Sequence, residues 1–373
     1  MNIENAKTQF LRRLPFLIIS ILALLAGMWS GLIRLGWAWP PLNPTLPMDH
    51  GPLMVAGFLG TLIALERSVA LEIMVSGVWK KLVYLPPLLS GVGVLLLLVG
   101  VQNWVGPLLL LLGSIGLVLM LLKIYLLHPV LHSAVIGLGA VLLAMGNLLW
   151  LLGAPVPNVV LWWAGFLILT IAGERLELSR MLVLSTLSRW LFVISMIVFL
   201  TGLVLGQVNY ALGARVAGLG MLALALWLLR YDIAWRRIKA GGQTRFIAIS
   251  LLSGYVWLLV AGVLAVFYGG EISGLKYDAI LHAIFLGFTF TMIFAHAPII
   301  FPVVLRVPVT YTPWFYSHLI LLHISLILRV GGDLMAIGWA RQWGGLLNAV
   351  ALLLFLFNTI MSSRLAGKDD GSN

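Results

Sequence analysis

Long apolar runs alternate with short polar connections along the whole chain of 373 residues. Each run has about 20 residues, which as an α-helix matches the roughly 30 Å hydrocarbon core of a bilayer. A transmembrane barrel would instead show segments of about 10 residues with alternating polarity. The pattern therefore predicts an all-α membrane protein.

We predict twelve transmembrane helices in a single polytopic membrane domain, residues 1–373. With 62% hydrophobic and only 9% charged residues, the chain has too few polar side chains to cover a soluble domain. The predicted spans are 14–36, 49–71, 82–100, 105–125, 130–151, 158–178, 188–206, 210–230, 245–268, 279–303, 311–330 and 344–363.

Lysine and arginine gather in the N-terminal tail and in alternate connections, for example at Lys80, Lys81, Arg236 and Arg237. Intervening connections such as WAWPPLNPTLP and LGAPVPN carry no basic residue. Because basic connections stay in the cytoplasm, both termini are expected inside a bacterial-type inner membrane. The net charge of +11 is thus read as a topology signal near anionic lipid rather than as a nucleic-acid surface.

A short motif recurs every four spans. Span two contains GFLGTLIALER, span six GFLILTIAGER and span ten GFTFTMIFAHA, and the tenth residue of each is polar: Glu66, Glu174 and His296. This period predicts three four-helix units about a pseudo-threefold axis. The pairs Glu66–Arg67 and Glu174–Arg175 are expected to form ion pairs at helix ends, with proton entry as the alternative.

Two histidines are predicted near the outer ends of spans two and ten, His50 and His282. An imidazole at that depth is costly without water, a hydrogen-bond partner or a metal. Two imidazoles at one level can bind a haem iron through both axial positions, whereas the alternative is interfacial histidines without a ligand. Arg329 and Arg341, after span eleven, would then pair with the haem propionates, or else anchor span ends at the interface.

The other histidines lie elsewhere along the spans. His296 is about 21 Å from His282 at 1.5 Å per residue, so one haem cannot take both. His128 and His132 are four residues apart, and a pair with this spacing on one helical face can chelate a metal. A possible second site, for copper or another haem, draws on His132, His296, His318 and His323. The alternative is that these side chains are hydrogen-bond partners between helices. The chain has no cysteine, so thiolate and iron–sulfur chemistry is excluded.

In these residues the sequence resembles the NnrS family, within the superfamily of twelve-span proteins related to subunit I of the haem-copper oxidases. The motifs that carry the resemblance are MDHGPLMVAGF in span two, GERLELSRML closing span six and LHAIFLGF in span ten. The resemblance implies a haem- and copper-containing membrane protein linked to nitric oxide metabolism. It implies that His50 and His282 are the axial ligands of a low-spin haem b.

The sequence departs from the oxidase pattern where the dinuclear centre would be. Spans six and seven contain no histidine, and the positions flanking His282 by two residues are Ile280 and Ile284. We therefore expect electron transfer, or the handling of a ligand such as nitric oxide, without reduction of oxygen or nitric oxide by this chain alone. A quinol or a redox protein is the expected partner. The alternatives are a transporter or channel without a cofactor, and a structural subunit of a membrane complex.

Overall fold

The computed structural model describes residues 3–101, 103–179, 182 and 184–369, so two residues of the GERLELSRML motif, 180 and 181, lie outside it. Throughout the described residues all regular secondary structure is helical. Twelve helices are long and apolar enough to cross a membrane, and each overlaps one of the predicted spans. The prediction of an all-α protein with twelve spans is confirmed, whereas the pseudo-threefold arrangement stays a prediction.

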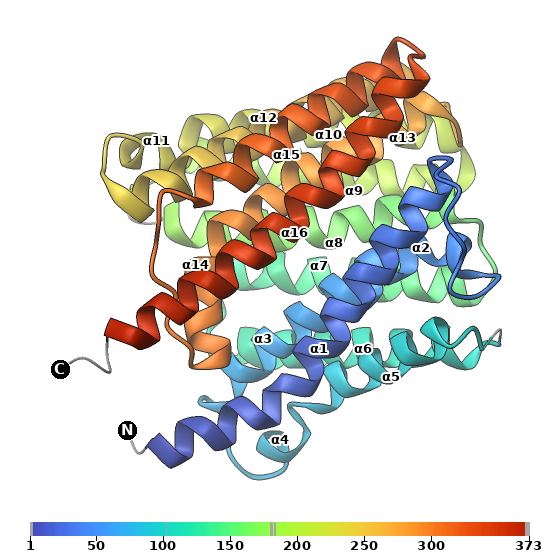
Figure 1. The fold of residues 1–373 in the computed structure, drawn as a ribbon. Coiled ribbons are helices and arrows are strands. Elements are labelled where there is room, and N and C mark those ends of the chain that lie inside the picture. The colour runs from blue at the N-terminus through green and yellow to red at the C-terminus, as the bar shows by residue number, and fades with distance from the viewer. Residues whose placement is uncertain (1–2, 102, 180–181, 183, 370–373) are drawn as a thin grey trace. The chain divides into compact units, whose positions relative to one another are not determined.

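The chain forms two compact units, whose helices are labelled in Figure 1. Unit 1 comprises Met1–Gly173 with Val303–Arg306, and unit 2 comprises Glu174–Pro302 with Val307–Asn373. The helices that begin in unit 1 are α1 (Ile3–Arg34), η1 (Leu46–Asp49), α2 (His50–Pro52), η2 (Leu53–Gly60), α3 (Thr61–Glu72), α4 (Gly77–Leu82), α5 (Leu85–Leu98), α6 (Val105–Leu127), α7 (Leu131–Leu151) and α8 (Val156–Ser179).

The helices that begin in unit 2 are α9 (Thr186–Val208), α10 (Tyr210–Tyr231), α11 (Ala234–Arg237), α12 (Gly242–Tyr268), α13 (Leu275–His282), η4 (Ala283–Phe290), α14 (Thr291–Leu305), α15 (Phe315–Leu334) and α16 (Gly338–Asp369). Local sequence sets several of their ends. The Ser185 hydroxyl accepts from the backbone N–H of Ser188 and caps α9, and Asn209 accepts from the backbone N–H of Leu212 at α10.

Spans two and ten share an interruption that span six does not have. The segments η2 and η4 are π-helical, each is eight residues long, and in each the glycine of the Gly-Phe pair is the fifth residue. Both segments end where a buried threonine, Thr61 or Thr291, opens the following α-helix. Span six is an uninterrupted α-helix. Because π-helical segments occur often at functional sites, the shared register makes spans two and ten candidates for carrying one.

Close helix packing in unit 2 depends on small residues. A side chain at Gly213 would collide with the backbone of Gly206, and one at Gly202 would collide with Ala217. These residues lie on α9 and α10, whose backbones therefore approach closely. Such contacts are typical of helices that associate within lipid, where the hydrophobic effect does not drive helices together.

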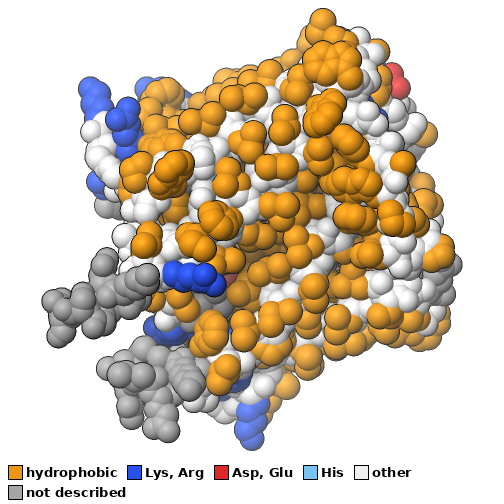
Figure 2. Space-filling model, in the orientation of Figure 1, with side chains coloured by type: hydrophobic (Ala, Val, Ile, Leu, Met, Phe, Trp, Pro, Cys, Tyr) orange, Lys and Arg blue, Asp and Glu red, His pale blue; other side chains and the backbone are white. Residues whose placement is uncertain are grey.

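The surface is suited to lipid contact. Apolar side chains cover most of the face in view (Figure 2), and large apolar residues such as Ile194, Ile197 and Val204 on α9 are more than half exposed. A soluble protein rarely exposes such a continuous apolar surface, whereas hydrocarbon chains can cover it. The protein is therefore a multi-pass membrane protein.

Candidate functional site

Charged side chains converge in unit 2 where α13, α15 and α16 meet. The Asp278 carboxylate accepts from Nη2 of Arg329 at 2.9 Å and from its Nε at 3.3 Å. Arg341 places Nη2 3.9 Å from the same carboxylate and Nε 2.8 Å from Oδ1 of Asp333. Arg329 and Asp333 are buried, so this cluster of two aspartates and two arginines lies largely out of contact with solvent. Charges in such a place must neutralise each other.

His282 belongs to this cluster. Its Nδ1 lies 2.8 Å from the backbone carbonyl oxygen of Asp278 and 3.3 Å from the Asp278 carboxylate. Both are acceptors, so Nδ1 carries a proton, and in the neutral ring the lone pair is then on Nε2. A metal-binding histidine is commonly oriented in this way, by a carbonyl or carboxylate on the nitrogen that does not bind the metal.

His50 reaches the same tautomer by another route. In unit 1 its Nδ1 lies 2.7 Å from the carbonyl oxygen of Gly27 on α1. The ring lies against Gly31, where an added Cβ would be 2.8 Å from the imidazole Cε1. Gly27 therefore supplies the acceptor, and Gly31, one turn later, leaves the space for the ring. Nε2 again holds the lone pair.

Two histidines of the predicted second site carry their proton on the other nitrogen. His323 accepts at Nδ1 from the indole N–H of Trp257 at 3.0 Å and donates from Nε2 to the Ser253 hydroxyl at 3.0 Å. His318 accepts at Nδ1 from the Asn358 amide at 3.1 Å, which places its proton on the buried Nε2. In these hydrogen-bonded states neither ring offers a lone pair to a metal.

The remaining histidines are dispersed. His296 lies with Nδ1 2.7 Å from the carbonyl oxygen of Met292, one turn earlier in its own helix. His132 is buried near the start of α7, whereas His128 is exposed and precedes that helix. His128 and His132 do not share a helix, because His128 follows the end of α6 and α7 begins only at Leu131. Among the residues that the structure describes, no three histidine or acidic side chains are grouped as metal ligands.

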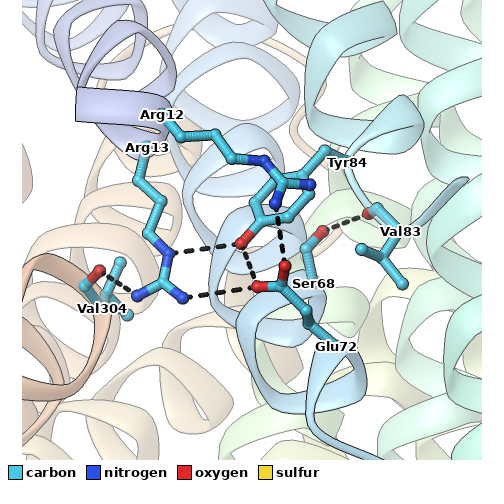
Figure 3. Close-up of polar contacts among 7 residues, drawn as sticks. All are labelled: Arg12, Arg13, Ser68, Glu72, Val83, Tyr84 and Val304. Carbon is cyan, nitrogen blue, oxygen red and sulfur yellow. Dashed lines mark hydrogen bonds and ion pairs between the residues drawn. The ribbon is translucent and has the colours of Figure 1, made fainter. Parts of the chain in front are cut away.

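A different charged cluster lies in unit 1 (Figure 3). Oε1 of Glu72 accepts from Arg12 at 2.9 Å. Oε2 of Glu72 accepts from the Tyr84 hydroxyl at 2.7 Å and from Nη2 of Arg13 at 3.5 Å. Arg13 is buried and also donates to the carbonyl oxygen of Val304 at 2.8 Å. This cluster joins α1, α3 and the end of α14, and each residue drawn takes part in at least one of the contacts marked. Its role is to hold helix ends together.

The Glu-Arg pairs of the repeat have different surroundings. Arg67 and Glu66 lie 3.7 Å apart, which is a loose ion pair. Arg175 instead forms two hydrogen bonds with Asp232, at 2.7 and 3.2 Å. The bidentate partner of Arg175 is thus a residue that the sequence analysis did not single out, 57 positions along the chain.

Asp278 and Asp333 are likewise missing from the sequence-based site. Asp278 is four residues before His282, so helical spacing was a signal that could have identified it. Asp333 is four residues after Arg329, and the same rule applies. The structure brings together His282, Arg329 and Arg341 of the predicted site through these two aspartates. Pairing of the arginines with haem propionates stays a prediction.

The chain belongs to the family described as a domain of unknown function (DUF8744), whose pattern matches residues 13–364. A search of curated proteins gave no match.

Proposed function

We propose that the protein is a haem-b-binding protein of a bacterial-type inner membrane, with both termini in the cytoplasm and with His50 and His282 as axial ligands. The observation that carries the proposal is the shared state of the two rings. Each has Nδ1 within hydrogen-bond distance of a backbone carbonyl oxygen, and in the neutral ring with the proton on Nδ1 the lone pair is on Nε2. Each also precedes a π-helical segment in a span with the same Gly-Phe register.

The donor set suits haem iron better than a hydrated metal ion. Imidazole is a common axial ligand of haem, and its second nitrogen is normally held by a carbonyl or carboxylate, as found for both residues here. Haem needs only two protein ligands, so the absence of a third ligand nearby in the described residues does not count against it. When bound, a bis-histidine haem b exchanges single electrons.

The residues around His282 would stabilise such a group without reacting themselves. Asp278 holds the imidazole by its carbonyl and carboxylate, and Arg329 balances the negative charge of that carboxylate. Electron transfer is the favoured activity, because two histidine ligands leave iron no open position. Handling of a ligand such as nitric oxide would require one histidine to leave. A quinol or a redox protein would supply the electron.

A transporter or channel without a cofactor is the second candidate. It is favoured by the π-helical interruptions in spans two and ten together with buried threonine hydroxyls beside them. The hydroxyls of Thr61, Thr289 and Thr291 have no hydrogen-bond partner in the described structure. Transporters use interrupted helices and polar groups of this kind within the membrane to bind their substrates.

A reduced-minus-oxidised absorption spectrum of detergent-purified protein separates the two candidates. We expect a low-spin b-type band in the wild type that is lost in both His50→Ala and His282→Ala. His128→Ala is the matched control, because His128 is exposed and outside the helices. A wild-type protein that folds but carries no haem would contradict the proposal. The transporter would then be the better account.

A further inference from the structure

A cavity of about 420 Å³ lies in unit 2 where α10 ends and α9 begins. It is independent of the histidines discussed above. Its walls combine apolar, aromatic and basic side chains with the hydroxyls of a serine and a tyrosine and with one carboxylate. The residues that line it are Leu182, Leu184, Ser185, Leu229, Arg230, Tyr231, Asp232, Trp235 and Arg236.

The carboxylate in the cavity wall, Asp232, is already neutralised by an arginine outside the cavity, Arg175. Asp232 is buried and bound by Arg175 through two hydrogen bonds, and it also accepts from the Tyr255 hydroxyl at 3.1 Å and from the backbone N–H of Ala234 at 2.7 Å. Arg175 and Tyr255 are not among the lining residues. The Asp232 carboxylate is therefore fixed in place and does not offset other charges in the cavity.

Two arginines in the wall retain their charge. Arg230 and Arg236 are both exposed, and neither has a carboxylate partner among the residues that the structure describes. Arg230 lies 5.3 Å from the centre of the Tyr231 ring, a cation–π contact that limits where its guanidinium can go. The cavity therefore carries two positive charges, one of them on a side chain held by an aromatic contact. Arginine binds phosphate through paired hydrogen bonds.

The remaining walls are apolar and aromatic. Trp235 is 52% exposed, and its indole N–H donates to the carbonyl oxygen of Leu229, which holds the ring at the cavity. Tryptophan at the end of a span typically lies at the level of lipid headgroups. Leu182, Leu184 and Leu229 add apolar surface next to the two arginines. Such a combination suits a ligand with an anionic head and a hydrocarbon tail.

We propose that this cavity binds the phosphate of an anionic phospholipid, with Arg230 and Arg236 on the phosphate and the leucines along the first part of an acyl chain. Basic pockets between transmembrane helices bind lipid headgroups of this kind. Free phosphate shares the charged end of this chemistry but cannot use the leucines. A lipid should therefore bind more tightly than inorganic phosphate.

The test is native mass spectrometry of the full-length protein in detergent, titrated with phosphatidylglycerol, with phosphatidylcholine and with inorganic phosphate. We expect one phosphatidylglycerol to bind with at least about tenfold preference over phosphatidylcholine. In the double variant Arg230→Gln/Arg236→Gln this affinity should fall by about tenfold or more, because charged hydrogen bonds to phosphate are lost. Inorganic phosphate should not displace the lipid at equal concentration.

Arg237→Gln/Lys239→Gln is the matched control. It removes the same charge from the adjoining stretch of the chain, but neither residue lines the cavity. Phosphatidylglycerol binding should be nearly unchanged in it. Equal losses in the two double variants, or equal binding of both lipids by the wild type, would overturn the proposal. Displacement of the lipid by inorganic phosphate at equal concentration would also overturn it and would assign the cavity to free phosphate. Circular dichroism of each variant confirms that it has folded.

Discussion

Spans two and ten both carry a histidine before a π-helical segment, yet they hold that histidine differently. His50 donates to the carbonyl of Gly27 on another helix and uses the space beside Gly31. His282 donates to Asp278 in its own helix, within a cluster of four charged side chains. One ring is thus oriented by shape and the other by charge. The same ring nitrogen, Nδ1, can thus be oriented by two unrelated surroundings.

The largest effect is expected from the charged surroundings. Arg329→Ala leaves the Asp278 carboxylate without its nearest cation in a largely buried place, and breaking such a pair costs about 3–5 kcal/mol. The midpoint of unfolding in sodium dodecyl sulfate titrations measures the loss. Lys276→Ala, an exposed change on α13, the helix that carries Asp278, should stay within about 0.5 kcal/mol. A variant Arg329→Ala as stable as the control would show that the cluster does not hold α13 to α15.

An intermediate effect should distinguish the two π-helical segments. A Cβ at Gly287 would lie 2.5 Å from Cγ of the Trp257 indole, whereas one at Gly57 would lie 3.0 Å from a methyl group of Val94. A rigid indole cannot move aside as a methyl can. We expect Gly287→Ala to cost about 1–3 kcal/mol and Gly57→Ala clearly less, by the same unfolding measurement. The reverse order would contradict the packing described for η2 and η4.

The smallest effect on stability is expected beside His50. In Gly31→Ala the new methyl group displaces the imidazole ring of His50, which can rotate away from Gly27. We therefore expect the variant to fold but to bind less haem. Gly137→Ala in α7 is the control, because an added Cβ there meets no atom within 4 Å. Haem per protein from absorbance, together with the unfolding midpoint, measures both quantities. Full haem content in Gly31→Ala would mean that the space at this glycine does not position His50.

The sequence predicted those features that depend on local pattern. Apolar runs of sufficient length predicted twelve spans, and in two of the three spans that share the Gly-Phe motif the motif lies in a π-helical segment, η2 or η4. Span six contains the same Gly-Phe motif but forms an unbroken α-helix. A motif made of abundant residues does not determine whether the backbone is α-helical or π-helical. The same limit applies to the threefold repeat as a whole.

The site was predicted less completely, because its hydrogen bonds depend on tertiary packing. The sequence identified His282, Arg329 and Arg341 but gave them an external partner, whereas Asp278 and Asp333 supply partners from within the chain. Which ring nitrogen of His318 or His323 carries the proton could not be read from spacing either. That choice is made by Asn358 and Trp257, on other helices.

The axial ligands are tested most directly by the midpoint potentials of His50→Met and His282→Met in potentiometric titrations of purified protein. Methionine can remain a ligand of haem iron, and a histidine–methionine pair raises the potential relative to two histidines. The account predicts that both variants keep haem and show a higher potential than the wild type, while His128→Met does not. Haem that keeps the wild-type potential and spectrum in both variants would contradict ligation by His50 and His282.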